Sequence, residues 1–162
     1  MGTSGRNFVE SVARVIPGYR GYSERESRRD MDRLVRETIA KRIEAAQREM
    51  DAAIASCSRS GALDQLEPLE ALRRRAAGAV NRLRHATGGY SGFFDTVQVE
   101  EAELERVHEH DARMSEQAEA LRAAATALAT SPGAEEVRNV DAALDRIEDQ
   151  LLQRDNVLKG VQ

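Results

Sequence analysis

The chain has 162 residues, of which 41% are apolar, 32% are charged and only 4% are aromatic, with no tryptophan. Its length suits one domain with a core, and its richness in alanine, leucine, arginine and glutamate predicts long helices rather than a β-sandwich, a barrel or a wholly disordered chain. The net charge of −4 is uneven, because residues 1–90 carry +5 and residues 91–162 carry −9. We expect these halves of opposite sign to pack against each other.

The sequence argues against a membrane-spanning or secreted protein. No segment reaches the roughly 18 consecutive apolar residues of a membrane span, and no apolar signal-peptide stretch follows the N-terminus. The single cysteine, Cys57, cannot form an internal disulfide, which fits a reducing compartment. We therefore expect a cytoplasmic location. A nucleic-acid partner is not expected, because acidic residues interrupt the arginine-rich segment over 25–36.

The first predicted elements are a disordered start over residues 1–7 and a short amphipathic helix over 8–16. A long helix follows, from a capping box that starts at Ser23 to a stop at Gly61. Its apolar residues recur at heptad spacing, which indicates packing along its whole length. The expected core positions are Met31, Val35, Ile39, Ile43, Ala46, Met50, Ala53 and Cys57.

Three further helices are predicted. One starts at a capping box of Asp64 and Glu67, a second spans 95–131, and the last starts with Pro132 at a first helical position. The expected core positions are Leu66, Leu69, Leu72, Ala76, Val80 and Leu83, then Leu104, Val107, Met114, Ala118, Leu121, Ala125 and Leu128, then Val137, Val140, Leu144, Ile147, Leu151 and Leu158.

The predicted fold class is all-α. Short turns between long helices favour antiparallel neighbours. We therefore expect an elongated antiparallel up-down four-helix bundle with coiled-coil-like seams and a short N-terminal helix. Residues 8–162 would form this single domain.

None of the six aromatic residues lies within the four long predicted helices, and five of them fall in two glycine-rich loops. The expected topology brings these loops to one end, where they form either an aromatic cap that seals the bundle or a recognition surface. The candidate partner-binding residues at this end are Tyr19, Arg20, Tyr22, Arg25, Arg28, Arg29, Asp30, Tyr90, Phe93, Phe94 and Asp95.

A polar break interrupts the fourth long segment. Glu105, His108 and Asp111 are spaced three apart, so they lie along one side of a helix, and Asp111 occupies a core position. Carboxylates and histidine at this spacing hold metals in helical bundles, and Asp30 or Glu37 lies at a suitable level to complete a site. The other interpretations are a buried Asp111 paired with an arginine, or a solvated face. A ferritin-like di-metal site needs a second E-x-x-H, and the chain has none.

Catalytic signatures such as a Walker loop, G-x-S-x-G and H-E-x-x-H are absent. The favoured function is therefore a non-enzymatic interaction or scaffold module for a protein partner, with no cofactor. The alternative is a metal-binding or metal-dependent bundle that holds a divalent metal through the Glu/His/Asp set. A third alternative is a homo-oligomer, in which the heptad seams pair between chains.

Three segments together resemble a known group. IPGYRGYSERESRRD over 16–30, GYSGFFD over 89–95 and residues 104–111 resemble an uncharacterised group of bacterial all-helical proteins with IPGYxGYxxxExRRxxD and GYxGFFD signatures. The resemblance implies a bacterial origin and a helical fold, and it implies no activity. At 109–111 a histidine stands where the group has an aromatic residue, which argues against the metal site.

Overall fold

The computed structural model describes residues 10, 12–16, 25–86 and 101–159, apart from the side chains of 25–30 and 101–105. Every regular element within these ranges is helical. In chain order they are α2 (Arg25–Ser60), the short 3-10 turn η1 (Leu63–Gln65), α3 (Leu66–His85), α5 (Glu101–Thr130) and α6 (Ala134–Leu158), preceded by helical residues at 10 and 12–15. The predicted all-α class is confirmed.

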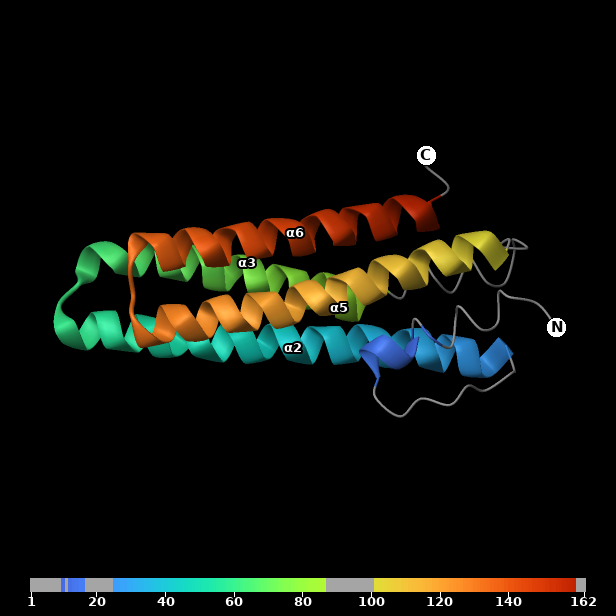
Figure 1. The fold of residues 1–162 in the computed structure, drawn as a ribbon, viewed down its shortest axis with the longest axis horizontal. Coiled ribbons are helices and arrows are strands. Elements are labelled where there is room, and N and C mark those ends of the chain that lie inside the picture. The colour runs from blue at the N-terminus through green and yellow to red at the C-terminus, as the bar shows by residue number, and fades with distance from the viewer. Residues whose placement is uncertain (1–9, 11, 17–24, 87–100, 160–162) are drawn as a thin grey trace.

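The four long helices lie along one long axis (Figure 1). They form two hairpins, α2 with α3 and α5 with α6, which are in contact through α2 and α5 and, less extensively, through α3 and α6. Within each hairpin the helices run in opposite directions, whereas α2 and α5 run in the same direction, as do α3 and α6. A short turn fixes only the helices that it joins, so the antiparallel expectation applies within the hairpins and not between them.

Aliphatic side chains fill the space between the helices, at the heptad positions predicted from the sequence. Where the structure describes their side chains, nearly all of these positions are buried; Met31, Leu66, Val137 and Leu158 are partly buried. Burying a leucine or isoleucine side chain contributes roughly 1.5–3 kcal/mol. These seams therefore hold the helices together along their length.

The turn after α2 is set by one glycine. Gly61 has a φ of +78°, a conformation that glycine adopts without a steric penalty. Its amide donates to the Ser58 carbonyl oxygen at 3.4 Å, and the Ala62 amide donates to the Cys57 carbonyl oxygen at 3.0 Å. This pair of bonds is a Schellman motif, which satisfies two of the last carbonyls of the helix. The predicted stop at this position is confirmed.

Two predicted helix starts are wrong. Asp64 and Glu67 form no capping box, because η1 leads directly into α3, whose N-cap makes no side-chain hydrogen bond. Pro132 is not at a first helical position, since α6 begins at Ala134 after an extended Gly133. The predicted capping box at Ser23 and the predicted helix start at 95 lie outside the described residues.

A short helical segment ahead of α2 contributes to the core. Val12 and Val15 are 1% exposed and pack with the buried residues of the bundle. Arg42 of α2 donates to the Val15 carbonyl oxygen at 3.1 Å, contacts Ser115 of α5 and pairs with Glu119 at 3.1 Å. Arg42 therefore ties this segment to both α2 and α5.

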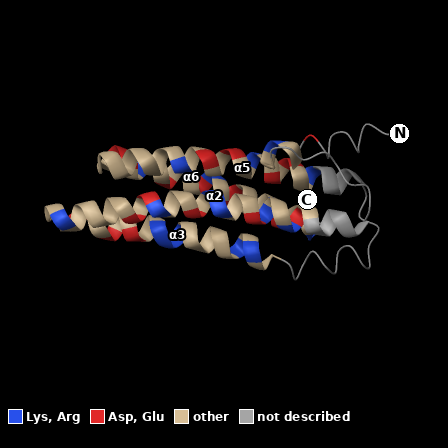
Figure 2. Cartoon of the chain, turned by 90° about the horizontal axis from the view of Figure 1, so that it is seen from below, with Lys and Arg blue, Asp and Glu red and all other residues tan. Residues whose placement is uncertain are grey.

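Ion pairs connect the basic and acidic halves of the chain. Arg75 on α3 contacts three carboxylates on α6, those of Asp141, Asp145 and Glu148. Basic and acidic residues are interspersed along α2, α5 and α6, whereas α3 is acidic at its start and basic further along (Figure 2). No helix in the part of the chain that the structure describes is long and apolar enough to cross a membrane.

Candidate functional site

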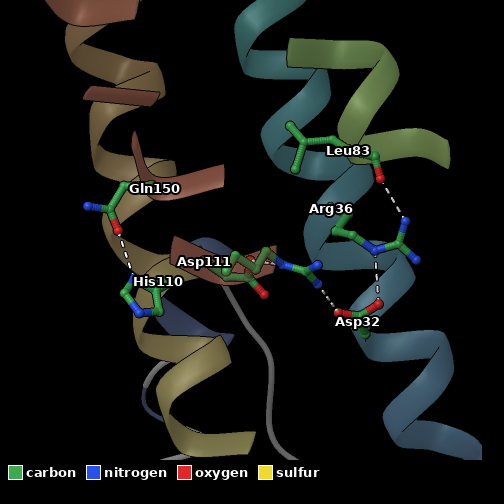
Figure 3. Close-up of polar contacts among 7 residues, drawn as sticks. Asp32, Arg36, Leu83, His110, Asp111 and Gln150 are labelled. Carbon is green, nitrogen blue, oxygen red and sulfur yellow. Dashed lines mark hydrogen bonds and ion pairs between the residues drawn. The ribbon is translucent and has the colours of Figure 1, made fainter. Parts of the chain in front are cut away.

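A network of buried charged side chains crosses the bundle, near the end at which α2 begins. Asp111 of α5 accepts a 2.8 Å hydrogen bond from Nε of Arg154 on α6, and Nη2 of the same arginine donates to Asp32 of α2 at 2.7 Å. Asp32 also accepts a 2.9 Å bond from Nε of Arg36, whose Nη1 donates to the Leu83 carbonyl oxygen of α3 at 2.7 Å (Figure 3). This network of side chains therefore connects all four long helices.

The four charged members of this network are almost inaccessible to solvent. Asp111, Asp32 and Arg154 are at most 1% exposed, and Arg36 is 4% exposed. Two carboxylates and two guanidinium groups balance in charge, which is the condition under which buried ions are tolerated. Loss of any one member leaves a neighbour with an uncompensated charge.

Arg36 also caps the end of α3. The last four carbonyls of a helix have no partner within the helix, and Leu83 lies in the last turn of α3. A cation at this position is favoured by the partial negative charge of the helix C-terminus. The contact between α2 and α3 is thus fixed at this level by a charge-assisted hydrogen bond.

Asp111 is the member of the network with an unused acceptor. Its Oδ1 is bonded to Arg154, whereas its Oδ2 accepts no hydrogen bond from the described residues. Burial raises the pKa of the Asp111 carboxyl, and the charge of Asp32 raises it further, while Arg154 and His108 lower it. The protonated form of Asp111 is therefore more favoured here than in water.

Asp111 pairs with an arginine, Arg154, as one interpretation of the polar break predicted. In the described ranges, no group of three or more histidine, cysteine, aspartate or glutamate residues could hold a metal ion. Glu37 is bonded to Arg84, and His108 is buried on α5. The side chains of Glu105 and Asp30 lie outside the described part, so a metal site that includes Glu105 stays a prediction.

The predicted partner-binding residues lie mostly outside the part that the structure describes. Tyr19, Arg20, Tyr22, Tyr90, Phe93, Phe94 and Asp95 fall outside it, as do residues 1–9, which include the predicted disordered start. Arg25, Arg28, Arg29 and Asp30 belong to the first turns of α2, and their side chains are not described. The helix ends that flank the two glycine-rich segments, namely the starts of α2 and α5 and the end of α3, lie toward the same end of the bundle (Figure 1).

A hollow of about 260 Å³ opens where α3 ends against α2. Its lining residues are Arg33, Arg36, Glu37, Leu83 and Arg84. Arg84 donates to both oxygens of Glu37, at 3.0 and 2.9 Å, and this hydrogen bonding lowers the pKa of the Glu37 carboxyl. Arg36 belongs both to the buried network and to the lining of this hollow. The hollow therefore connects the network with the protein surface.

Arg154 was not predicted from the sequence, although the sequence carries a signal for it. Heptad steps of three and four from Leu151 fall at Arg154 and Leu158, so the arginine stands at a core position of α6. An arginine at a core position of one helix and Asp111 at a core position of another are complementary in charge. Pairing these two exceptions would have predicted the centre of the network.

Comparison of the chain with protein-family models, with curated proteins and with solved structures found no match in any of the three.

Proposed function

We propose that the chain is a non-enzymatic interaction or scaffold module, built as an elongated up-down four-helix bundle that binds a protein partner at one end. The contact surface is the loop end, formed by Tyr19, Arg20, Tyr22, Arg25, Arg28, Arg29, Asp30, Tyr90, Phe93, Phe94 and Asp95. The observation that carries the proposal is the position of the helix ends that flank the two glycine-rich segments, since these ends lie toward the same end of the bundle.

The chemistry of these residues suits recognition. Tyrosine, phenylalanine and arginine are enriched at protein interfaces, and tyrosine and arginine often dominate the binding energy. Charged neighbours select the partner and raise the association rate. The buried network begins about two turns into α2 and ties four helices together, so it supplies the rigid support that a recognition surface needs.

Two alanine variants test this proposal. Tyr22→Ala and Phe93→Ala should each abolish capture of the partner from a lysate and leave the melting temperature nearly unchanged. The matched control is Leu63→Ala at the opposite end of the bundle, where Leu63 is 67% exposed, and it should leave capture intact. A fall of several degrees in both aromatic variants would instead identify an aromatic cap.

A divalent-metal alternative is favoured by one observation. Asp111 Oδ2 is buried without a hydrogen bond from the described residues, and His108 lies almost one turn earlier on α5. With Glu105 these residues would supply the oxygen and nitrogen ligands of a metal site. Metal content by mass spectrometry, with melting curves before and after chelation, tests it. Stoichiometric metal that is lost in His108→Ala would support the alternative, and an unchanged melt without metal would reject it.

A further inference from the structure

The hollow beside α3 is positively charged. Its lining contains three guanidinium groups and one carboxylate, for a net charge of +2, together with Leu83. Much of this charge is already engaged. Arg84 holds Glu37 and also donates to both oxygens of Glu44, at 2.6 and 3.0 Å. Most of the remaining donors therefore belong to Arg33 and Arg36.

Arg36, which lines this hollow, has an unused donor. Its Nε is bonded to Asp32 and its Nη1 to the Leu83 carbonyl oxygen, while its Nη2 makes no hydrogen bond with the described residues. The side chain is only 5% exposed, and the close-up shows the third nitrogen pointing away from both partners (Figure 3). A buried guanidinium with an unused donor at the wall of a hollow is ready to bind an anion.

Arg33 supplies the second donor group. It stands almost one turn before Arg36 on α2, its side chain is exposed, and it forms no hydrogen bond or ion pair with the described residues. Both arginines line the same hollow. One guanidinium held in place, and one whose donors make no hydrogen bond with the described residues, can together engage the two oxygens of a planar carboxylate.

We propose that this hollow binds an aspartate or glutamate side chain from an acidic segment of the protein partner. The proposal rests on the function proposed above and names the chemistry of its partner. Carboxylate is favoured over phosphate, because Glu37, Asp32 and the negative end of α3 all reduce the local positive potential that a dianion requires.

A nuclear magnetic resonance titration with a single-residue probe tests the proposal without the partner. Acetyl-glutamate-amide should shift the side-chain Nε signals of Arg33 and Arg36 saturably, with a Kd on the order of 1–10 mM. Arg33→Gln should weaken this binding about tenfold or more. The matched control is Arg74→Gln, which removes an exposed arginine of α3 outside the hollow and should leave the titration unchanged.

A second variant should act in the opposite direction. Glu37→Gln removes the one carboxylate of the lining, so binding of acetyl-glutamate-amide should become roughly threefold to tenfold tighter. Equal shifts with acetyl-glutamine-amide, no saturable shift, or tighter binding of inorganic phosphate would each overturn the proposal. If Arg33→Gln still captures the partner, the acidic-segment proposal is wrong as well. That result would not contradict the proposed interaction module. Capture that survives in Tyr22→Ala, with the titration intact, would instead reject the loop end as the contact surface and support the hollow.

Discussion

Nη2 of Arg154 on α6 donates a 2.7 Å hydrogen bond to Asp32 on α2, although these two helices belong to different hairpins and share no extensive packing contact. The same guanidinium donates to Asp111 on α5, so one side chain connects the two hairpins through the interior. Aliphatic contacts could form in several registers along regular heptad seams. A buried ionic contact is satisfied in only one of them, which is the use of buried polar groups that is best attested in coiled coils.

Removing Arg154 should therefore destabilise the protein strongly. Arg154→Met keeps most of the volume but leaves two buried carboxylates without their shared cation, so the free energy of unfolding should fall by about 3–5 kcal/mol. In a chain of this length the melting temperature should fall by about 6–20 °C. Calorimetry or urea denaturation measures both.

The control for this prediction is Arg75→Met. Arg75 also faces carboxylates of α6, but those carboxylates are largely exposed, so the loss should be about 1 kcal/mol or less. Equal losses in the two variants would show that burial does not distinguish the Arg154 network.

Asp111→Asn should change how stability depends on pH. Burial raises the pKa of the Asp111 carboxyl above the usual value of an aspartate, so the folded protein binds a proton at a pH where the unfolded chain is still ionised. The stability that this proton confers is present at low pH and is lost as the pH rises through the folded-state pKa. Asparagine does not titrate, so the stability of the variant relative to the unchanged protein should be highest at neutral pH and should fall on acidification.

Urea unfolding of both proteins between neutral pH and pH 4 checks the prediction. The quantity to follow is the free energy of unfolding of the variant minus that of the unchanged protein at each pH. A difference that rises toward acid would mean that the folded-state pKa of Asp111 is depressed.

Arg36→Gln should loosen the end of α3. The substitution removes the charge-assisted bond to the Leu83 carbonyl oxygen and one of the two cations of Asp32, at a cost of about 1.5–3 kcal/mol. Amide hydrogen exchange should accelerate most in the last turn of α3. Arg82→Gln is the matched control, because Arg82 lies in the same turn but pairs, among the described residues, with Asp155 alone at the surface. Similar exchange in both variants would contradict a capping role for Arg36.

Arg42→Gln should release the short segment that contains Val12 and Val15. It removes the bond to the Val15 carbonyl oxygen and the contacts to α5. Trypsin should then cleave faster after Arg14, whose side chain is exposed within this segment. Arg48→Gln, at an exposed position further along α2, should leave the cleavage rate unchanged. An unchanged rate in Arg42→Gln would show that the two valines alone hold the segment.

Helix type and core positions could be predicted from the sequence, because heptad spacing directly records which side of a helix is apolar. The direction of α5 relative to α2 could not, since similar aliphatic seams can pair in parallel or antiparallel fashion. Asp111 was recognisable as an exception to its seam. Its partner was not, because Arg154 is separated from Asp111 by 43 positions and only the packing of α5 on α6 brings them together.

Helix starts were harder to predict than helix ends. Gly61 determines the end of α2 through its own backbone conformation, so the residue type alone carries the information. A capping box depends on where the chain enters the helix, and η1 supplies an entry into α3 that leaves Asp64 ahead of the N-cap position.

The absence of aromatic residues from the long helices gives this protein two separate optical signals. There is no tryptophan, and Tyr19, Tyr22 and Tyr90 all stand outside the bounds of α2, α3, α5 and α6. Tyrosine fluorescence therefore follows only the two glycine-rich segments, while far-ultraviolet circular dichroism follows the helices. One sample can be heated while both signals are recorded. The comparison shows whether the two glycine-rich segments lose their structure before the helices unfold or together with them.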